Sequence, residues 1–132
     1  EACRSSSPNP IGAKNLARAL AAARSAAGDV PAAIQNALKQ SDTNVIGIGG
    51  VHNASLRHQL QAEDAYTRDE LAAALQKRID WSDSQIGGAY ADTDVTNLIL
   101  VLGFMQALEI DRVILKDINL TDGVLIEPSF WQ

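Results

Sequence analysis

The segment from Asp92 to Leu108 limits the possible folds most, because it has a helical pattern and is apolar on nearly every side. Val95 and Leu98 define one face of this predicted helix, while Leu100 lies on the other. A helix that is apolar all round is buried against several neighbours. Its longest apolar run, Leu98 to Met105, is too short to span a bilayer, so no membrane partner is expected. The sequence therefore predicts a central helix covered by other elements.

Two short apolar segments, Asn44 to Ile48 and Arg112 to Lys116, have the length and composition of buried strands. Helical patterns of ten or more residues separate them, which favours parallel strands joined by right-handed crossovers. Aromatic residues make up only 5% of the chain, so the core is expected to be aliphatic. The predicted fold class is α/β, with the two strands adjacent in one sheet and the helix 92–108 packed on it.

The strongest helix signal outside the central helix is a capping box formed by Thr67 and Glu70. Leu71, Leu75 and Ile79 follow it at four-residue intervals, which predicts a helix over 68–79. The remaining expected helices are an alanine-rich one ending near Gly28, one with Pro31 in its first turn and Ile34 and Leu38 on its buried face, one over 51–60, and a short one over 120–126. Residues 81–90 are expected to form a loop.

The domain organisation follows from the proline- and serine-rich start of the chain. Residues 1–10 are interpreted as a linker or lead-in, and residues 11–132 as one domain.

Cys3 is the single cysteine and cannot form an internal disulfide, and no secretory signal is present, so a cytoplasmic location is expected. The net charge of −5, with Lys and Arg scattered, argues against DNA as a partner. A phosphorylated ligand would need a local site.

The best candidate for such a site is the glycine turn Gly47–Gly50, between a predicted strand and a predicted helix. Ligands of parallel α/β sheets bind beyond the carboxyl ends of the strands, and glycines allow the backbone to approach an anion closely. The alternative is that the glycines only form a tight turn, with the polar residues that follow exposed at a helix start. The candidate ligand-binding residues are Gly47, Gly49, Gly50, Val51, His52 and Asn53.

Other polar residues have simpler structural explanations. Asp92 and Asp94 open the long helix, where carboxylates complement the helix dipole, so no metal site is expected there. Asp117 and Asp122 are interpreted as turn formers, although Asp117 follows a strand and a ligand role stays open. Phe130 and Trp131 are expected to be apolar anchors. No arrangement of a nucleophile and a base is present, so no catalytic residue is assigned to the chain.

Three stretches, in order, resemble the second domain of the Ppx/GppA family of exopolyphosphatases and guanosine-pentaphosphate phosphohydrolases. Pro10 to Ala13, followed by Leu16, is similar to the start of that domain's first helix. Val45 to Gly50 is similar to its strand and glycine turn. Asp94 to Leu108, continued by residues 113–125, resembles its ending. The resemblance covers residues 8–127, and its specificity lies in the order and spacing of these stretches.

The resemblance implies a ribonuclease-H-like, actin-like fold and an enzyme that releases terminal phosphate from polyphosphate or guanosine pentaphosphate. The ligand is expected in a cleft between two lobes, with magnesium in the full-length protein and none bound by this chain alone. The family's phosphate loops and catalytic glutamate lie upstream, so the missing amino-terminal lobe is an expected partner. The glycine turn is the part of the cleft that this chain retains.

The chain departs from the family pattern at two places. Val51 stands where the family has a threonine after its glycine pair, and Asn119, Thr121 and Asp122 replace Gly, Arg and Glu. Two alternatives to a phosphohydrolase lobe therefore remain. One is a non-catalytic sensor of a phosphorylated ligand, and the other is a dimerisation module, in which case the partner is a second copy of the chain.

Overall fold

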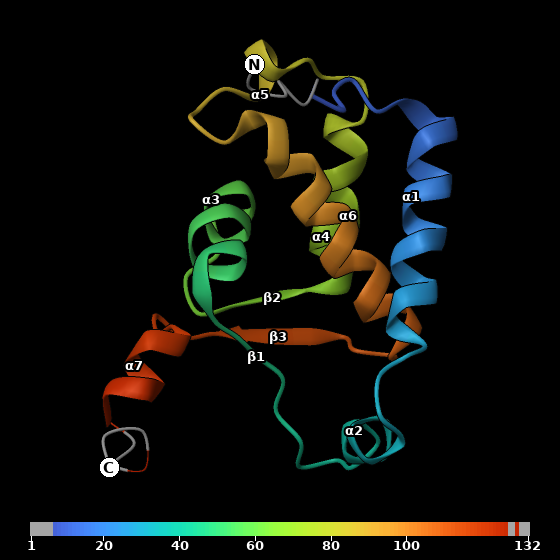
Figure 1. Ribbon diagram of the computed structural model, residues 1–132. Coiled ribbons are helices and arrows are strands. Elements are labelled where there is room, and N and C mark those ends of the chain that lie inside the picture. The colour runs from blue at the N-terminus through green and yellow to red at the C-terminus, as the bar shows by residue number, and fades with distance from the viewer. Residues whose placement is uncertain (1–6, 127–128, 130–132) are drawn as a thin grey trace.

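The computed structural model describes residues 7–126 and 129, and it has a mixed α/β fold (Figure 1). Its sheet contains β1 (Ile46–Gly47), β2 (Ala65–Thr67) and β3 (Arg112–Leu115). The helical elements are α1 (Gly12–Ala27), α2 (Ala32–Leu38), a π-helical segment η1 (Gly50–Leu56) continued by α3 (Arg57–Leu60), α4 (Arg68–Arg78), α5 (Asp83–Ile86), α6 (Ala91–Ala107) and α7 (Leu120–Ile126). The predicted helices are confirmed, and the predicted loop over 81–90 contains the single turn α5.

The sheet has the strand order β1-β3-β2. β1 and β3 are parallel, with Ile46 opposite Ile114 and Gly47 opposite Leu115, which confirms the predicted adjacent pair. The sheet as a whole is mixed, because a third strand that the sequence did not predict, β2, runs antiparallel to β3 with Tyr66 opposite Val113. β2 is a three-residue strand that directly precedes α4.

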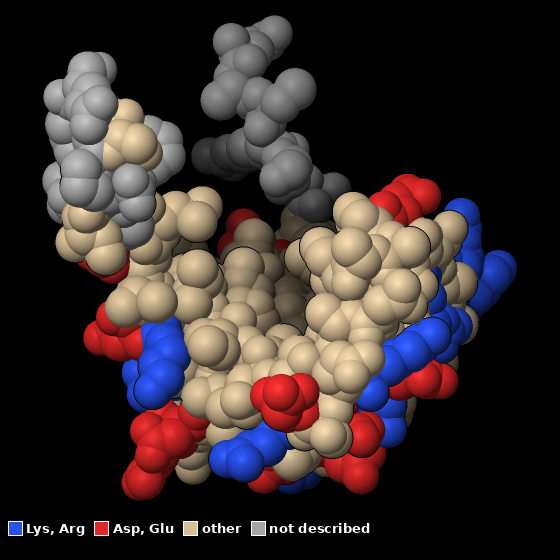
Figure 2. All heavy atoms as spheres, turned by 90° about the horizontal axis from the view of Figure 1, so that it is seen from below, with Lys and Arg blue, Asp and Glu red and all other residues tan. Residues whose placement is uncertain are grey.

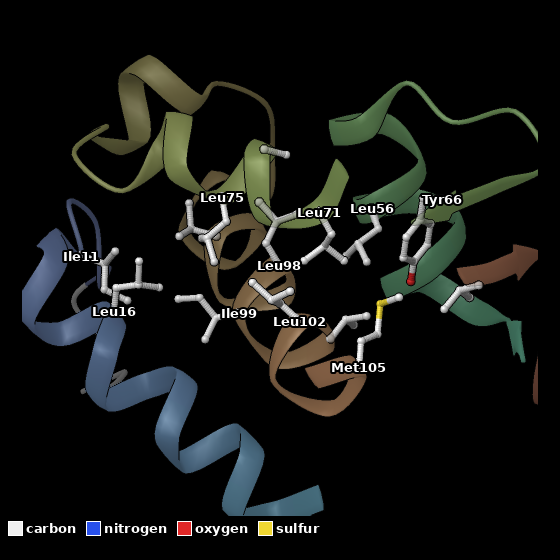
Figure 3. Close-up of a cluster of buried hydrophobic side chains, with 14 of the residues drawn as sticks. Ile11, Leu16, Leu56, Tyr66, Leu71, Leu75, Leu98, Ile99, Leu102 and Met105 are labelled. Atoms are coloured by element: carbon white, nitrogen blue, oxygen red, sulfur yellow. The ribbon is translucent and has the colours of Figure 1, made fainter. Parts of the chain in front are cut away.

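The helices α3, α4 and α6 lie on one side of the sheet, and α1 runs alongside α6 (Figure 1). The buried side chains between these elements form one continuous cluster, part of which is seen in Figure 3. The members of this core are Ile11, Leu16, Leu56, Tyr66, Leu71, Ala74, Leu75, Val95, Leu98, Ile99, Val101, Leu102, Met105, Val113 and Leu115. The core is mainly aliphatic, as the composition predicts, and α6 contributes more of it than any other element.

The central position predicted for the helix 92–108 is confirmed with one exception. Val95, Leu98 and Val101 are buried, but Leu100 is 46% exposed, so α6 has one solvent-facing edge. On the side facing α1, Gly103 lets the two backbones come close. A Cβ atom added to Gly103 would lie 2.3 Å from the Cβ atom of Ala23. The α1–α6 contact therefore depends on two very small residues.

Two predictions of burial are wrong. Ile34 is 51% exposed, and no residue of α2 is buried, because α2 lies apart from the helices that enclose the core (Figure 1). Ile46 is also 51% exposed, because β1 is an edge strand and Ile46 lies on the face opposite its buried neighbour Gly47.

The capping box at the start of α4 is confirmed. The Glu70 amide donates to the Thr67 hydroxyl at 3.3 Å, and the Thr67 amide donates to the Glu70 carboxylate at 2.8 Å. The bonds from the backbone and side chain of Thr67 lower the pKa of Glu70. A lowered folded-state pKa means that this contribution to stability is present at neutral pH and is lost as the carboxylate becomes protonated at acid pH.

Thr67→Ala is expected to lower the free energy of unfolding by about 1 kcal/mol, because it removes the acceptor for an otherwise unpaired helix amide. Urea melts at neutral pH measure the loss, and Thr67→Ser is the matched control because it keeps the hydroxyl. Superimposable melts for the alanine variant and the parent protein would contradict the prediction.

No helix within residues 7–126 is long and apolar enough to cross a membrane. On the face seen from below, Lys and Arg are interspersed with Asp and Glu around the rim, and no continuous basic surface is visible there (Figure 2).

Cys3, Phe130 and Trp131 lie outside the described residues, so the expectations for them stay predictions. Ser7 and Asn9 of the lead-in donate hydrogen bonds to Asp83, at 2.7 and 2.9 Å.

Candidate functional site

The predicted glycine turn lies at the carboxyl end of β1, where the chain passes from the sheet into η1. Gly49 has φ 73° and ψ −173°, a conformation that is almost restricted to glycine. Its amide donates to the carbonyl of Ile118 at 3.0 Å, which joins the turn to the segment that follows β3. Gly50 then begins η1, and a Cβ atom added to it would meet no atom within 4 Å. Both glycines leave open space where a side chain would lie, but only Gly49 is also required by its backbone conformation.

His52 connects η1 to the sheet. Its Nδ1 lies 2.8 Å from the hydroxyl of Tyr66 on β2, and the two rings are stacked with their centroids 6.2 Å apart. Burial lowers the pKa of His52 and raises the pKa of Tyr66, so both side chains are uncharged at neutral pH. Gly47 makes room for this pair, since a Cβ atom there would lie 2.6 Å from Nδ1 of His52 and 2.9 Å from Cγ1 of Val113.

Asn53 also turns toward the sheet rather than away from it. Its side-chain amide donates a hydrogen bond to the carbonyl of Lys116, just beyond β3. Its Oδ1 is buried and accepts no hydrogen bond within the described residues. The contacts of His52 and Asn53 thus hold η1 against β2 and β3.

A cleft of about 1060 Å³ lies between η1 with α3 on one side and the segment from Trp81 to the start of α6 on the other. Among the predicted site residues, Gly50 and Val51 line it. Its other lining residues are Ala54, Ser55, Arg57, His58, Gln59, Gln61, Arg78, Trp81, Ile86, Gly87, Gly88, Ala89, Tyr90, Thr93, Asp94 and Asn97. The glycine turn therefore borders this cleft through Gly50 and Val51. The other predicted site residues, Gly47, Gly49, His52 and Asn53, do not line it.

A polar cluster of Ser55, Gln59, Asp94 and Asn97 forms part of the cleft wall. The Ser55 hydroxyl donates to the Asp94 carboxylate at 2.6 Å and accepts from the Asn97 amide at 3.1 Å. The Gln59 amide donates to the Ser55 hydroxyl and to the Asp94 carbonyl, each at 3.0 Å. These bonds join η1 and α3 to α6 and fix the four side chains relative to one another.

Arg78 and Trp81 form another part of the wall. The Arg78 guanidinium lies 5.6 Å from the centre of the Trp81 ring and donates to the carbonyls of Ala74 and Gln59, at 2.8 and 3.1 Å. These carbonyl bonds anchor the guanidinium to α4 and to the end of α3. The Trp81 ring is consequently positioned by α4, although it belongs to the loop that follows that helix.

The carboxylates considered in the sequence divide into two groups. Asp92 and Asp94 both lie in the first turn of α6, as predicted, but Asp94 also accepts the bond from Ser55. Asp122 accepts from the Asn119 amide at 2.8 Å at the start of α7, which confirms a local turn-forming role. Within residues 7–126 and 129, no group of three or more His, Cys, Asp or Glu side chains is arranged to hold a metal ion.

No known protein family, curated protein sequence or solved structure matches the chain. The family assignment therefore stays a prediction from the ordered motifs.

Sequence reasoning missed the polar cluster, whose members lie up to 42 residues apart. One local signal was available, because Ser55 and Gln59 share a helix face, as do Asp94 and Asn97, but nothing in the sequence pairs the two helices.

Proposed function

We propose that the chain is one lobe of a Ppx/GppA-type phosphohydrolase and forms one wall of a cleft that binds a phosphorylated ligand. The parent protein would release terminal phosphate from polyphosphate or guanosine pentaphosphate, and a ribonuclease-H-like, actin-like fold would be completed by an amino-terminal lobe. The observation that carries the proposal is the glycine turn at the carboxyl end of β1, which opens into the cleft through Gly50 and Val51.

The backbone at this turn suits an anion. η1 and α3 form one continuous helical segment from Gly50 to Leu60, and Gly49 at its start makes no side-chain capping bond. The first amides of a helix have no acceptor within the helix, and their dipoles favour negative charge. Because Gly50 has no side chain and faces open space, a phosphate oxygen can approach these amides closely.

The described residues do not provide the other requirements of phosphoryl transfer. Hydrolysis needs a group that positions the attacking water and charges that stabilise the transition state. In the proposed assembly, the upstream lobe supplies these groups, and magnesium neutralises charge on the phosphates when it is bound. This chain contributes the backbone amides and the enclosing wall, so it is expected to be inactive by itself.

A non-catalytic phospholigand sensor is the second candidate. It is favoured by Val51, which lines the cleft where the family pattern has a threonine, so the wall offers an isopropyl group instead of a hydroxyl. Phosphate release by the complete parent protein distinguishes the two functions, because a sensor would bind the ligand and leave it intact.

The purified chain is expected to release no phosphate from polyphosphate or guanosine pentaphosphate in the presence of magnesium, relative to a buffer blank. The physical reason is that one wall of a cleft binds its ligand without positioning a nucleophile. Turnover that persists through purification and disappears in a Gly49→Val/Gly50→Val variant would contradict this expectation.

Binding at the turn is tested by titrating the isotope-labelled chain with inorganic tripolyphosphate and following its amide signals. We expect the largest shifts at Gly50 and Val51, and a weaker affinity for Gly50→Val because its side chain blocks the approach to the amides. Ala32→Val is the matched control, since Ala32 is also the first residue of a helix and exposed but is remote from the cleft. Equal affinity of the two variants would refute binding at the turn.

A further inference from the structure

We propose that the same cleft contains a second subsite that binds a neutral, hydroxyl-bearing ring, either a free sugar or the ribose of a nucleoside. The subsite consists of the polar cluster Ser55, Gln59, Asp94 and Asn97 together with the indole of Trp81. It deepens the proposed function and rests on it for the nucleoside case, because guanosine pentaphosphate carries a ribose in addition to its phosphates. A bare polyphosphate would leave this subsite empty.

The polar cluster is rich in hydrogen-bond acceptors. Each Asp94 oxygen offers more than one lone pair, and the Ser55 hydroxyl occupies a single acceptor position on Oδ1. The side-chain amide of Gln59 uses its nitrogen for two bonds, while its buried Oε1 accepts none within the described residues. Because Oε1 is buried, the acceptors that a ligand can reach in the cleft belong to Asp94 and Asn97, which are partly exposed. A ligand that carries several O–H donors matches this inventory.

The internal bonds of the cluster hold it ready for a ligand. Asp94 and Asn97 project from α6, and both are tied to Ser55 on η1, so the side chains do not have to be ordered during binding. Both residues are partly exposed and line the cleft. A pair of planar polar side chains fixed in this way can accept from and donate to adjacent hydroxyls of one ring.

The aromatic wall supplies the complementary apolar surface. Trp81 is 37% exposed and lines the cleft, and Tyr90 lines it as well, with 70% of its surface exposed. Ligand sites commonly combine such apolar walls with a few fixed polar groups. The cation on Arg78 already lies over the Trp81 ring, which disfavours a positively charged ligand at that wall. A neutral ring with an apolar face and hydroxylated edges fits both walls.

The inference is tested on the 132-residue chain by titrating it with D-ribose, guanosine and inorganic tripolyphosphate while following its amide and side-chain NMR signals. We expect ribose or guanosine to shift the signals of Asp94, Asn97 and the Trp81 indole. Binding of ribose alone would show that the ring suffices, and binding of guanosine alone would show that the ring is recognised within a nucleoside.

Asp94→Asn is expected to weaken the affinity for ribose or guanosine, whichever binds, by at least about tenfold. The reason is that a hydrogen bond to a charged acceptor becomes a bond to a neutral one. Asp92→Asn is the matched control. Asp92 lies in the same helical turn and is exposed outside the cleft lining, so its removal should leave the affinity unchanged. Thermal melts of both variants check that the fold is retained, and the amide oxygen introduced by Asp94→Asn can still accept the bond from Ser55.

The inference is overturned if neither ribose nor guanosine binds at millimolar concentration, or if the two aspartate variants weaken binding equally. Its failure is distinct from failure of the proposed function. Tripolyphosphate shifts at Gly50 without any sugar binding would overturn this inference alone, whereas sugar binding without tripolyphosphate binding would support it and count against the phosphate site.

Discussion

Leu98→Ala is expected to lower the free energy of unfolding by about 2–5 kcal/mol, the range measured when a large aliphatic side chain is truncated in a packed core. Leu98 is 0% exposed and lies in the middle of α6, where it points toward Leu71 and Leu75 of α4 (Figure 3). The side chains around the new cavity come from several elements, so the site cannot collapse by moving one of them. Since small domains are stable by about 5–15 kcal/mol, this loss would remove a large share of the total stability.

Leu100→Ala provides the control for this prediction. Leu100 is on the same helix, and the substitution has the same effect on helix propensity, but its side chain is 46% exposed. We expect a loss below about 1 kcal/mol, because less apolar area leaves the core and no closed cavity forms. Urea melts of the two variants measure the difference. Similar midpoints would mean that α6 does not have the central packing role that its burial indicates.

The elements that the sequence predicts well are those whose signals are local. The Thr67–Glu70 box and the ladder Leu71–Leu75 define α4 through contacts within one or two helical turns, and the structure reproduces both. The pair β1 and β3 is also recovered, because both strands are short apolar runs and the long helix between them leaves few ways to connect them.

The elements that the sequence does not predict depend on distant partners. β2 has only three residues, too few for an alternating pattern, and Tyr66 is equally well explained as a staple residue before α4. Its strand conformation exists because β3 pairs with it. Ile34 and Ile46 are apolar but exposed for the same kind of reason, since burial depends on which elements cover a face.

The candidate site shows the same division. The glycines of the turn form a short local pattern in the sequence, and the backbone conformation of Gly49 is a local requirement for glycine. The contact of His52 with Tyr66 and the bond between Ser55 and Asp94 are side-chain pairings across the fold, and no repeat or spacing in the sequence indicates them. The turn was therefore predictable, and the opposite wall of its cleft was not.

Gly103→Ala is expected to destabilise the protein by about 2–3 kcal/mol, near the upper part of the range for overpacking a core. The added methyl group would lie 2.3 Å from Cβ of Ala23 and 3.3 Å from its Cα and carbonyl carbon. No rotation of a side chain relieves this contact, because the neighbouring atoms are the backbone of α1 and a methyl group fixed to it. The two helices must move apart, which opens the packing around Leu16 and Ile99 on the same interface (Figure 3).

An alanine is the better helix former by about 1 kcal/mol, so propensity alone predicts the opposite sign for this substitution. The sign of the measured change therefore distinguishes close helix packing from intrinsic propensity. A gain in stability for Gly103→Ala would show that α1 and α6 are not in close contact at this point.

The double variant Ala23→Gly/Gly103→Ala tests the contact directly. Ala23→Gly alone should cost about 1 kcal/mol, because it places a glycine inside α1. In the double variant the methyl group has moved from one helix to the other, so the two backbones can keep their distance. We therefore expect the double variant to be more stable than Gly103→Ala, with a favourable coupling within the range of about 0.5–3 kcal/mol found for residues in contact. Urea melts of the four proteins give the coupling, and strict additivity would mean that the two residues do not touch.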